Sequence, residues 1–305
     1  MLGALLTTVF FSLSAILATR SIRLVGATTA NLGRLVVAFL CLGLYAFTFG
    51  QGFRGAGLNW FLLSGVIGMG LGDLALFATL PRLGSRLSVL ITQCMAVPIA
   101  MLAERVWLGT RLAGAEILWA VVILTGVAIA LTPSRSRPPQ VPLRPSGFIF
   151  GLLSAAGQGL GAVVSRRAYS VTEYNVETID GVTAAFQRIS GGLVISALFF
   201  LALHAWSRRS ASPSSRSAAP LPSRANRSAW LIVSANALAG PVLGVSCYQW
   251  ALASTPSGIV LPIVATTPLV IIPLSMWLEG EKPTRQSVIG GVAAVCGVVA
   301  LALVH

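Results

Sequence analysis

Long apolar stretches of about 20 residues follow one another along the whole chain. An α-helix of this length crosses the roughly 30 Å hydrocarbon core of a bilayer. Uninterrupted apolar runs satisfy their backbone hydrogen bonds as helices, whereas the strands of a membrane barrel alternate between apolar and polar positions. The pattern therefore predicts an all-α integral membrane protein with ten transmembrane helices, at residues 2–19, 27–48, 59–80, 87–107, 113–132, 147–165, 183–206, 229–252, 258–278 and 287–304.

Composition and charge agree with this pattern. Of the 305 residues, 55% are hydrophobic and 10% are charged, whereas a soluble domain carries roughly 25% charged residues. A net charge of +13 would favour nucleic-acid binding if the basic side chains formed a patch. Nineteen of the 21 Lys and Arg residues instead lie at the ends of the apolar windows or between them. Since positive loops stay on the cytoplasmic side, the charge indicates topology, and no nucleic-acid partner is expected.

Four landmarks recur in the same order in the two halves of the chain. They are an arginine early in the second window, two glycines four residues apart in the third, a proline in the fourth and a Gly-Val step in the fifth. In that order, the residues are Arg34 and Arg188, Gly68/Gly72 and Gly240/Gly244, Pro98 and Pro268, and Gly126 and Gly297. Repeats of this kind build many membrane proteins that carry solutes.

The repeat divides the chain into two units of five helices. The first covers 1–132, the second covers 147–304, and a Pro- and Arg-rich linker at 133–146 separates them, while 207–228 is expected to be a flexible loop. An odd number of spans places the second copy upside down, which predicts an inverted repeat. With both termini outside, the cytoplasmic loops hold 14 Lys or Arg and the others 5, and Arg166 with Arg167 is the main exception.

These features together resemble the EamA type of the drug/metabolite transporter superfamily. The resemblance covers nearly the whole chain, and the second half fits best, with Glu281 before Gln286, Gly290 and Gly297. In the first half, Thr110 and Arg111 stand at the corresponding place, and the nearest acid is Glu104. The resemblance implies a secondary transporter in the inner or plasma membrane that exports amino acids or related metabolites by alternating access.

Charged residues inside a span are costly and therefore need a partner or a water-filled cavity. Arg34 and Asp73 each lie about seven residues from the predicted cytoplasmic ends of their helices, so both are about 10 Å deep and can pair. The pair is either an inner gate and substrate site or a structural ion pair. Toward the outer side, we expect Glu104 and Arg188 to form a counterpart pair, near Tyr248 and Gln249. Asp73 and Glu104 are the acids best placed for proton coupling.

Neutral polar residues near mid-membrane complete the expected substrate site. Two of the predicted helices carry such residues before a proline, which frees a backbone carbonyl one turn earlier. Broken helices of this kind line substrate sites in repeat-built transporters, although Ser and Thr also satisfy proline kinks with no ligand present. The candidates are Thr92, Gln93, Gln158, Asn236, Thr266 and Thr267. The glycine pairs are expected to serve helix packing.

Other classes of protein fit the sequence less well. An enzyme needs a convergent nucleophile, base or metal cluster, yet the two histidines, His204 and His305, lie far apart and the four cysteines are scattered. No catalytic residue, metal or cofactor is expected. A flippase for a lipid-linked or polyprenyl-phosphate substrate remains the alternative, because membrane arginines can hold a phosphate. The expected partners are the lipid bilayer and a small-molecule substrate, with the protein as a monomer or homodimer.

Overall fold

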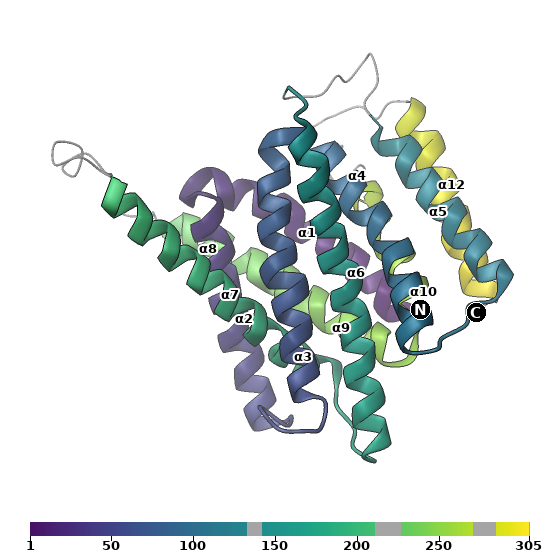
Figure 1. Cartoon of the computed structure of the whole chain (residues 1–305), viewed down its shortest axis with the longest axis horizontal. Coiled ribbons are helices and arrows are strands. Elements are labelled where there is room, and N and C mark those ends of the chain that lie inside the picture. Colours follow the sequence, from purple (N-terminus) through teal and green to yellow (C-terminus); the bar gives the residue numbers. More distant parts are fainter. Residues whose placement is uncertain (133–141, 211–226, 271–284, 305) are drawn as a thin grey trace.

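The computed structural model describes residues 1–132, 142–210, 227–270 and 285–304, which are almost entirely helical (Figure 1). Within these residues, nine helical stretches are long and apolar enough to cross a membrane, and Ser257–Val270 is a shorter one. The predicted all-α membrane fold is confirmed. The elements are α1 (Leu2–Val25), α2 (Ala27–Thr48), α3 (Leu58–Gly65), η1 (Val66–Gly72), α4 (Asp73–Trp107), α5 (Gly114–Leu131), α6 (Pro145–Tyr174), α7 (Gly181–Ser210), α8 (Arg227–Ala237), η2 (Leu238–Gly244), α9 (Val245–Ser254), α10 (Ser257–Val264) and α12 (Arg285–Val304).

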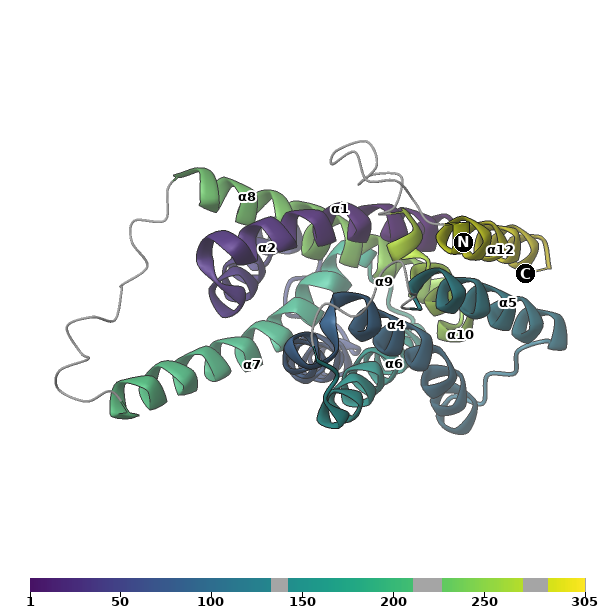
Figure 2. The same ribbon diagram turned by 90° about the horizontal axis from the view of Figure 1, so that it is seen from above.

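The two halves of the chain pack on one another reciprocally. The first helix of each half packs on the third span of the other half: α1 lies against α8, η2 and α9, and α6 lies against α3 and η1. Likewise α2 packs on α7, and α5 packs on α12 (Figure 2). At the α5–α12 contact, a Cβ atom on Gly126 would lie 2.6 Å from the Gly290 carbonyl oxygen, and one on Gly290 would lie 2.4 Å from that of Gly126. Such reciprocity is what two inverted copies produce.

A π-helical segment interrupts the third span of each half at the same place. The segments η1 and η2 are both seven residues long, and each contains one of the glycine pairs predicted from the sequence. The missing side chains let neighbouring backbones approach, since a Cβ atom on Gly157 of α6 would lie 2.6 Å from the Cα atom of Gly72. The wide turns of a π-helix are often found at functional sites, and both segments reach the central cavity described below.

Two predicted boundaries differ from those of the structure. The predicted spans at 59–80 and 87–107 are separate, as Leu58–Leu83 and Leu87–Trp107, but the residues between them are helical, because α4 continues from Asp73 to Trp107 through Pro81. Figure 1 shows the ribbon rising through α3 and the start of α4 and returning downward along the rest of α4. The predicted end of the sixth span at residue 165 is wrong, since α6 continues to Tyr174. Arg166 and Arg167 therefore lie on a helix rather than in a loop. The apolar pattern ends at their charges, but polar partners inside the bundle allow the helix to continue.

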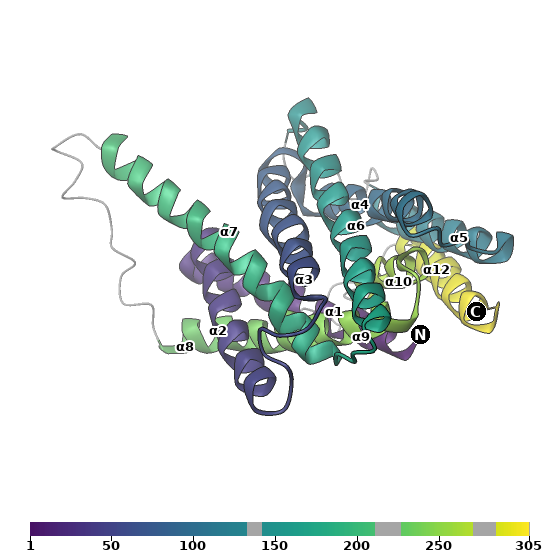
Figure 3. The same cartoon turned by 60° about the horizontal axis from the view of Figure 1, so that its bottom comes forward.

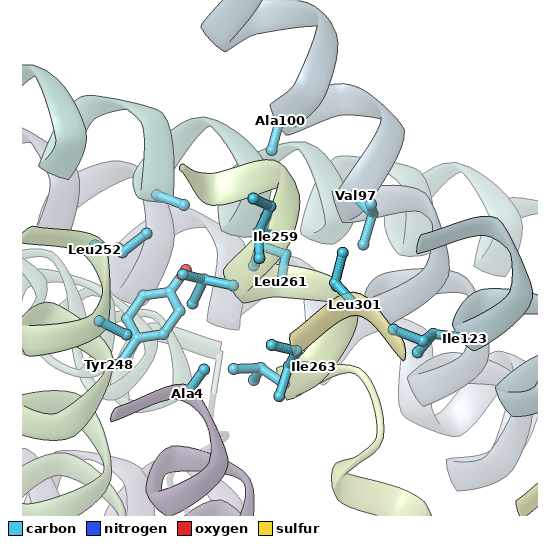
Figure 4. Close-up of a cluster of buried hydrophobic side chains, with 14 of the residues drawn as sticks. Ala4, Val97, Ala100, Ile123, Tyr248, Leu252, Ile259, Leu261, Ile263 and Leu301 are labelled. Atoms are coloured by element: carbon cyan, nitrogen blue, oxygen red, sulfur yellow. The ribbon is translucent and has the colours of Figure 1, made fainter. Parts of the chain in front are cut away.

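The short helix α10 lies at the centre of the apolar core. All eight of its residues are buried, and Ile259, Leu261 and Ile263 meet side chains from α4, α5, α9 and α12 (Figure 4). Residues 271–278 of the predicted span at 258–278 lie outside the described residues; the described part is not one continuous helix, because α10 ends at Val264 and a turn precedes the helical residues 267–270. Pro268 lacks the N–H that would bond the Val264 carbonyl, and the Thr267 hydroxyl donates to that carbonyl at 2.6 Å instead.

Candidate functional site

A cavity of about 290 Å³ lies between the two halves, and both halves supply its walls. Its polar lining includes seven of the residues that the sequence predicted for a substrate site: Arg34, Asp73, Gln93, Gln158, Arg188, Tyr248 and Thr267. The repeat-related Gly68 and Gly240 face it from η1 and η2. Apolar side chains complete the walls, among them Phe11, Leu76, Val89 and Leu261. The cavity is therefore mostly apolar with a few charged and polar groups, as small-molecule sites generally are.

Arg34 and Asp73 form an ion pair in the cavity wall. Arg34 lies two turns into α2, and Asp73 is the first residue after η1. The Arg34 Nη2 atom donates to Asp73 Oδ2 at 3.2 Å, while Arg34 Nε donates to Asn31 Oδ1 at 2.9 Å. Their side chains are 21% and 17% exposed. The pair expected from the sequence is thus formed, and it leaves this part of the cavity without net charge.

Arg188 is the second arginine of the cavity and is more deeply buried, at 6% exposure. Its guanidinium carbon lies 5.3 Å from the centroid of the Tyr248 ring, a favourable cation–π distance. Its Nη1 atom reaches Ser165 Oγ at 3.4 Å, and its Nε atom has no hydrogen-bond partner in the described part of the chain. Among those residues, none of the acidic side chains forms a salt bridge with Arg188.

The predicted ion pair between Glu104 and Arg188 is wrong, because Glu104 binds Arg166. Arg166 Nε donates to Glu104 Oε1 at 3.3 Å, and Arg166 Nη1 donates to the carbonyl oxygens of Leu252 at 2.7 Å and Ala253 at 3.1 Å. Glu104 Oε2 also accepts the backbone N–H of Ser257 at 2.8 Å and the Ser257 hydroxyl. Counting residues along separate helices gave similar depths for Glu104 and Arg188, but it did not determine which side chains face one another.

We call this set the Glu104 cluster: Glu104, Arg166, Ser257 and the carbonyls of Leu252 and Ala253. It joins the end of α4 to α6, to the end of α9 and to the start of α10, which lie together at one end of the bundle (Figure 3). Along α6, Arg166 lies eight residues beyond the cavity residue Gln158, or about 12 Å at 1.5 Å per residue. The cluster therefore lies beyond one end of the cavity.

Four other predicted site residues lie near the cavity without lining it. Asn236 Oδ1 accepts a hydrogen bond at 2.7 Å from Ser14, which does line the cavity. Gln249 Nε2 donates to Ser165 Oγ at 3.0 Å, and the Thr266 hydroxyl donates to the Ile263 carbonyl at 2.6 Å. The buried Thr92 hydroxyl has no partner among the described residues. Glu104 is likewise absent from the lining.

The sequence contained one signal for the Glu104 cluster. Arg166 and Arg167 were the main exception to the charge bias of the loops. In the structure, both side chains have partners on other helices. Arg166 is paired with Glu104, and the guanidinium carbon of Arg167 lies 6.0 Å from the ring centroid of Trp60. Ser165 and Ser257 gave no comparable signal, because isolated serines are common in transmembrane helices.

Metal ligands do not gather in the part of the chain that the structure describes. Within those residues, no group of three or more His, Cys, Asp or Glu side chains is arranged to hold an ion. Cys41, Cys94, Cys247 and Cys296 are all free thiols. The Glu281 of the family resemblance lies outside the described residues.

Comparison with known proteins agrees with the fold and the repeat. The chain matches the EamA-like transporter family over residues 1–132 and 145–303, one stretch for each half. A crystal structure with 19% sequence identity superposes with a TM-score of 0.72, over 99% of this chain and 96% of that chain, and so shows a shared fold. A search of curated proteins finds no match. The chain belongs to the EamA-like transporter family, within the drug/metabolite transporter superfamily, and is a multi-pass membrane transporter.

Proposed function

We propose that the protein is a secondary transporter of the cell membrane that exports a small metabolite, such as an amino acid, by alternating access. The observation that carries this proposal is the cavity of about 290 Å³ between the inverted halves, which contains both repeat-related arginines. Substrate sites of repeat-built transporters lie at the interface of the repeats. At roughly 30 Å³ per water molecule, the volume corresponds to about ten waters, which suits a solute of amino-acid size.

The two ends of the cavity differ in a way that supports alternating access. Arg34 and Asp73 are the more exposed charged residues of the wall, whereas Arg188 is nearly inaccessible. Beyond Arg188, the Glu104 cluster ties α4 of the first half to three helices of the second. With both termini outside, as the loop charges predict, the Arg34 end opens to the cytoplasm and the cluster closes the outer end. Rocking of one half against the other would then break the cluster and release the substrate outside.

Proton coupling is proposed at Asp73 rather than at Glu104. Asp73 lines the cavity, and its side chain is 17% exposed. Glu104 lies outside the cavity, is 3% exposed and accepts hydrogen bonds from Arg166 and Ser257. A coupling group must exchange its proton with both sides as the substrate moves. The position of Asp73 satisfies that requirement better.

Flux measurements on reconstituted protein test the proposed function. Proteoliposomes would be loaded with labelled amino acids, one at a time, with and without a pH gradient, and liposomes without protein would serve as the control. We expect protein-dependent flux of at least one amino acid that responds to the gradient. A parallel assay would follow transbilayer movement of a polyprenyl phosphate. Movement of that lipid without flux of any amino acid would overturn the proposal in favour of the flippase.

Cells provide an independent test of direction and location. A strain without the gene should accumulate the exported solute, whereas loss of a lipid flippase would change the pools of the lipid carrier instead. Fractionation should place the protein in the inner or plasma membrane. Mass measurement of the purified protein in lipid nanodiscs would show whether it is a monomer or a homodimer.

A further inference from the structure

The two halves of the protein differ at one charged position in the cavity. Arg34 and Arg188 are repeat-related, and so are Gly68 and Gly240. Counting five residues on from those glycines leads to Asp73 in the first half and to Val245 in the second, each directly after its π-helical segment. Both residues line the cavity. The first arginine therefore has an acidic partner, whereas the second has an apolar residue at the equivalent place.

This asymmetry leaves the cavity with an excess positive charge. Among the described residues, the charged residues of its wall are Arg34, Asp73 and Arg188, and Asp73 is bonded to Arg34. Arg188 is 6% exposed, and its Nε atom has no hydrogen-bond partner among the described residues. Arg188 makes no salt bridge among the described residues, and the charge of Asp73, which also acts on it, is shared with Arg34. A buried arginine so weakly compensated is unfavourable, because water no longer solvates its charge. An anion in the cavity would restore the balance.

From this we infer that Arg188 is a carboxylate subsite and that the substrate is a carboxylate on an apolar body. A single negative charge neutralises the excess, whereas a phosphate dianion would exceed it. The planar guanidinium presents parallel N–H groups that match the two oxygens of a carboxylate. The Tyr248 ring lies beside the guanidinium, with 5.3 Å between the guanidinium carbon and the ring centroid. The apolar wall residues Phe11, Leu76 and Val89 provide a surface for the rest of the molecule.

The inference rests on the proposed function and names the substrate class for the same cavity. It covers an amino acid and a simple organic acid, because both present a carboxylate to Arg188; the organic acid also neutralises the excess charge of the cavity, whereas the ammonium group of an amino acid leaves it unchanged. Four probes with the same branched apolar body separate these chemistries: leucine, 4-methylpentanoate, 3-methylbutylamine and 3-methylbutyl phosphate. They present a zwitterion, a carboxylate, an amine and a phosphate. Binding of each would be measured by calorimetry on the full-length protein in lipid nanodiscs.

Variants at Val245 test the missing acid directly. Val245→Asp supplies the second half with the counterpart of Asp73 and should neutralise Arg188, while Val245→Asn introduces similar polarity without charge. We expect Val245→Asp to weaken both carboxylates about ten-fold more than Val245→Asn does, and Arg188→Gln to weaken them by about ten- to a hundred-fold. Arg188→Lys retains the charge without the paired N–H groups, so its affinity for the carboxylates should lie between those of the wild type and of Arg188→Gln. Arg54→Gln, an exposed arginine of the α2–α3 loop, is the charge-matched control.

Several results would overturn the inference. Carboxylates that fail to bind the wild type, or that bind it no better than the amine does, would do so. Equal losses of all four probes in Arg188→Gln would mean that this arginine acts only on the fold. Tighter, Arg188-dependent binding of the phosphate would assign the subsite to phosphate instead. If the flux screen detects transport of a solute without a carboxylate, the transporter proposal stands and the carboxylate subsite fails.

Discussion

Arg166 and Glu104 join α6 to the end of α4 through a contact of 3.3 Å between Nε and Oε1. The same arginine bonds the Leu252 carbonyl at the end of α9, and Glu104 accepts the backbone N–H of Ser257 at the start of α10. One ion pair therefore holds four helices together at one end of the bundle. Because the first half contributes only α4, this pair also connects the two halves.

Breaking that pair should destabilise the protein. Glu104→Gln or Arg166→Gln leaves the other charge without its partner, and each should lower the free energy of unfolding by about 3 kcal/mol. The free energy of unfolding of the double variant should fall by less than the sum of the two single losses, because neither charge remains unpaired. Thermal unfolding in lipid nanodiscs measures all three, with the exposed Arg105→Gln as control. Additive losses would show that the two side chains act independently.

Asp73 should be required for coupling to protons. In Asp73→Asn, the flux measured with a pH gradient should fall to the level measured without one, because the amide cannot carry a proton. Glu173→Gln, at an exposed acid of α6 that does not line the cavity, is the matched control and should retain a response to the gradient. Proteoliposome flux with equal amounts of reconstituted protein checks both variants. Undiminished, gradient-driven transport by Asp73→Asn would remove this residue from the mechanism.

Two glycines of the third span should respond differently to the same substitution. A Cβ atom on Gly65 would lie 1.7 Å from the carbonyl oxygen of Arg188, which is backbone, so Gly65→Ala should cost about 3 kcal/mol of unfolding free energy or more. A Cβ atom on Gly68 would lie 2.8 Å from Arg188 Nη2, at the mobile end of a side chain. Gly68→Ala should cost less than about 1 kcal/mol yet weaken 4-methylpentanoate binding. Equal losses of stability would contradict this account of α7 packing.

Thr266 and Thr267 form a second matched pair. Both hydroxyls donate at 2.6 Å to a carbonyl three residues earlier, but only Thr267 lines the cavity. Thr266→Val and Thr267→Val should each lower the unfolding free energy by about 1 kcal/mol. Only Thr267→Val should also change probe affinity in calorimetry. A change in affinity with Thr266→Val and none with Thr267→Val would mean that the cavity wall is assigned incorrectly.

The apolar pattern predicted the spans because a bilayer leaves little choice other than helices of sufficient length. Some of the bounds that it predicted differ from those of the structure. α6 continues past Arg166 because Glu104 and two carbonyls meet that charge inside the bundle. α4 continues through Pro81, and the fourth span of the second half breaks before Pro268, although both positions carry the same residue type. Local sequence does not distinguish them, since tertiary partners decide whether a freed carbonyl is satisfied.

The candidate site was predictable in part. Arg34 and Asp73 could be paired because their depths matched and only a few charges lay inside the spans. Arg188 was assigned to the wrong partner, because depth along a helix does not fix which neighbour a long side chain reaches. The vacant acid position at Val245 appears only when the repeat is aligned and the cavity lining is known. The residue types of the site were therefore predictable from the sequence, whereas their pairings depend on three-dimensional packing.

The most direct test of alternating access locks the end of the bundle that the Glu104 cluster closes. Glu104→Cys and Ser257→Cys would be introduced after replacing the four native cysteines, and a bifunctional thiol reagent containing a disulfide would cross-link them in proteoliposomes. The account predicts that solute flux stops when cross-linking is complete and returns when a reductant cleaves the link. Flux that continues at the uncross-linked rate would show that this end need not open, which would contradict the mechanism.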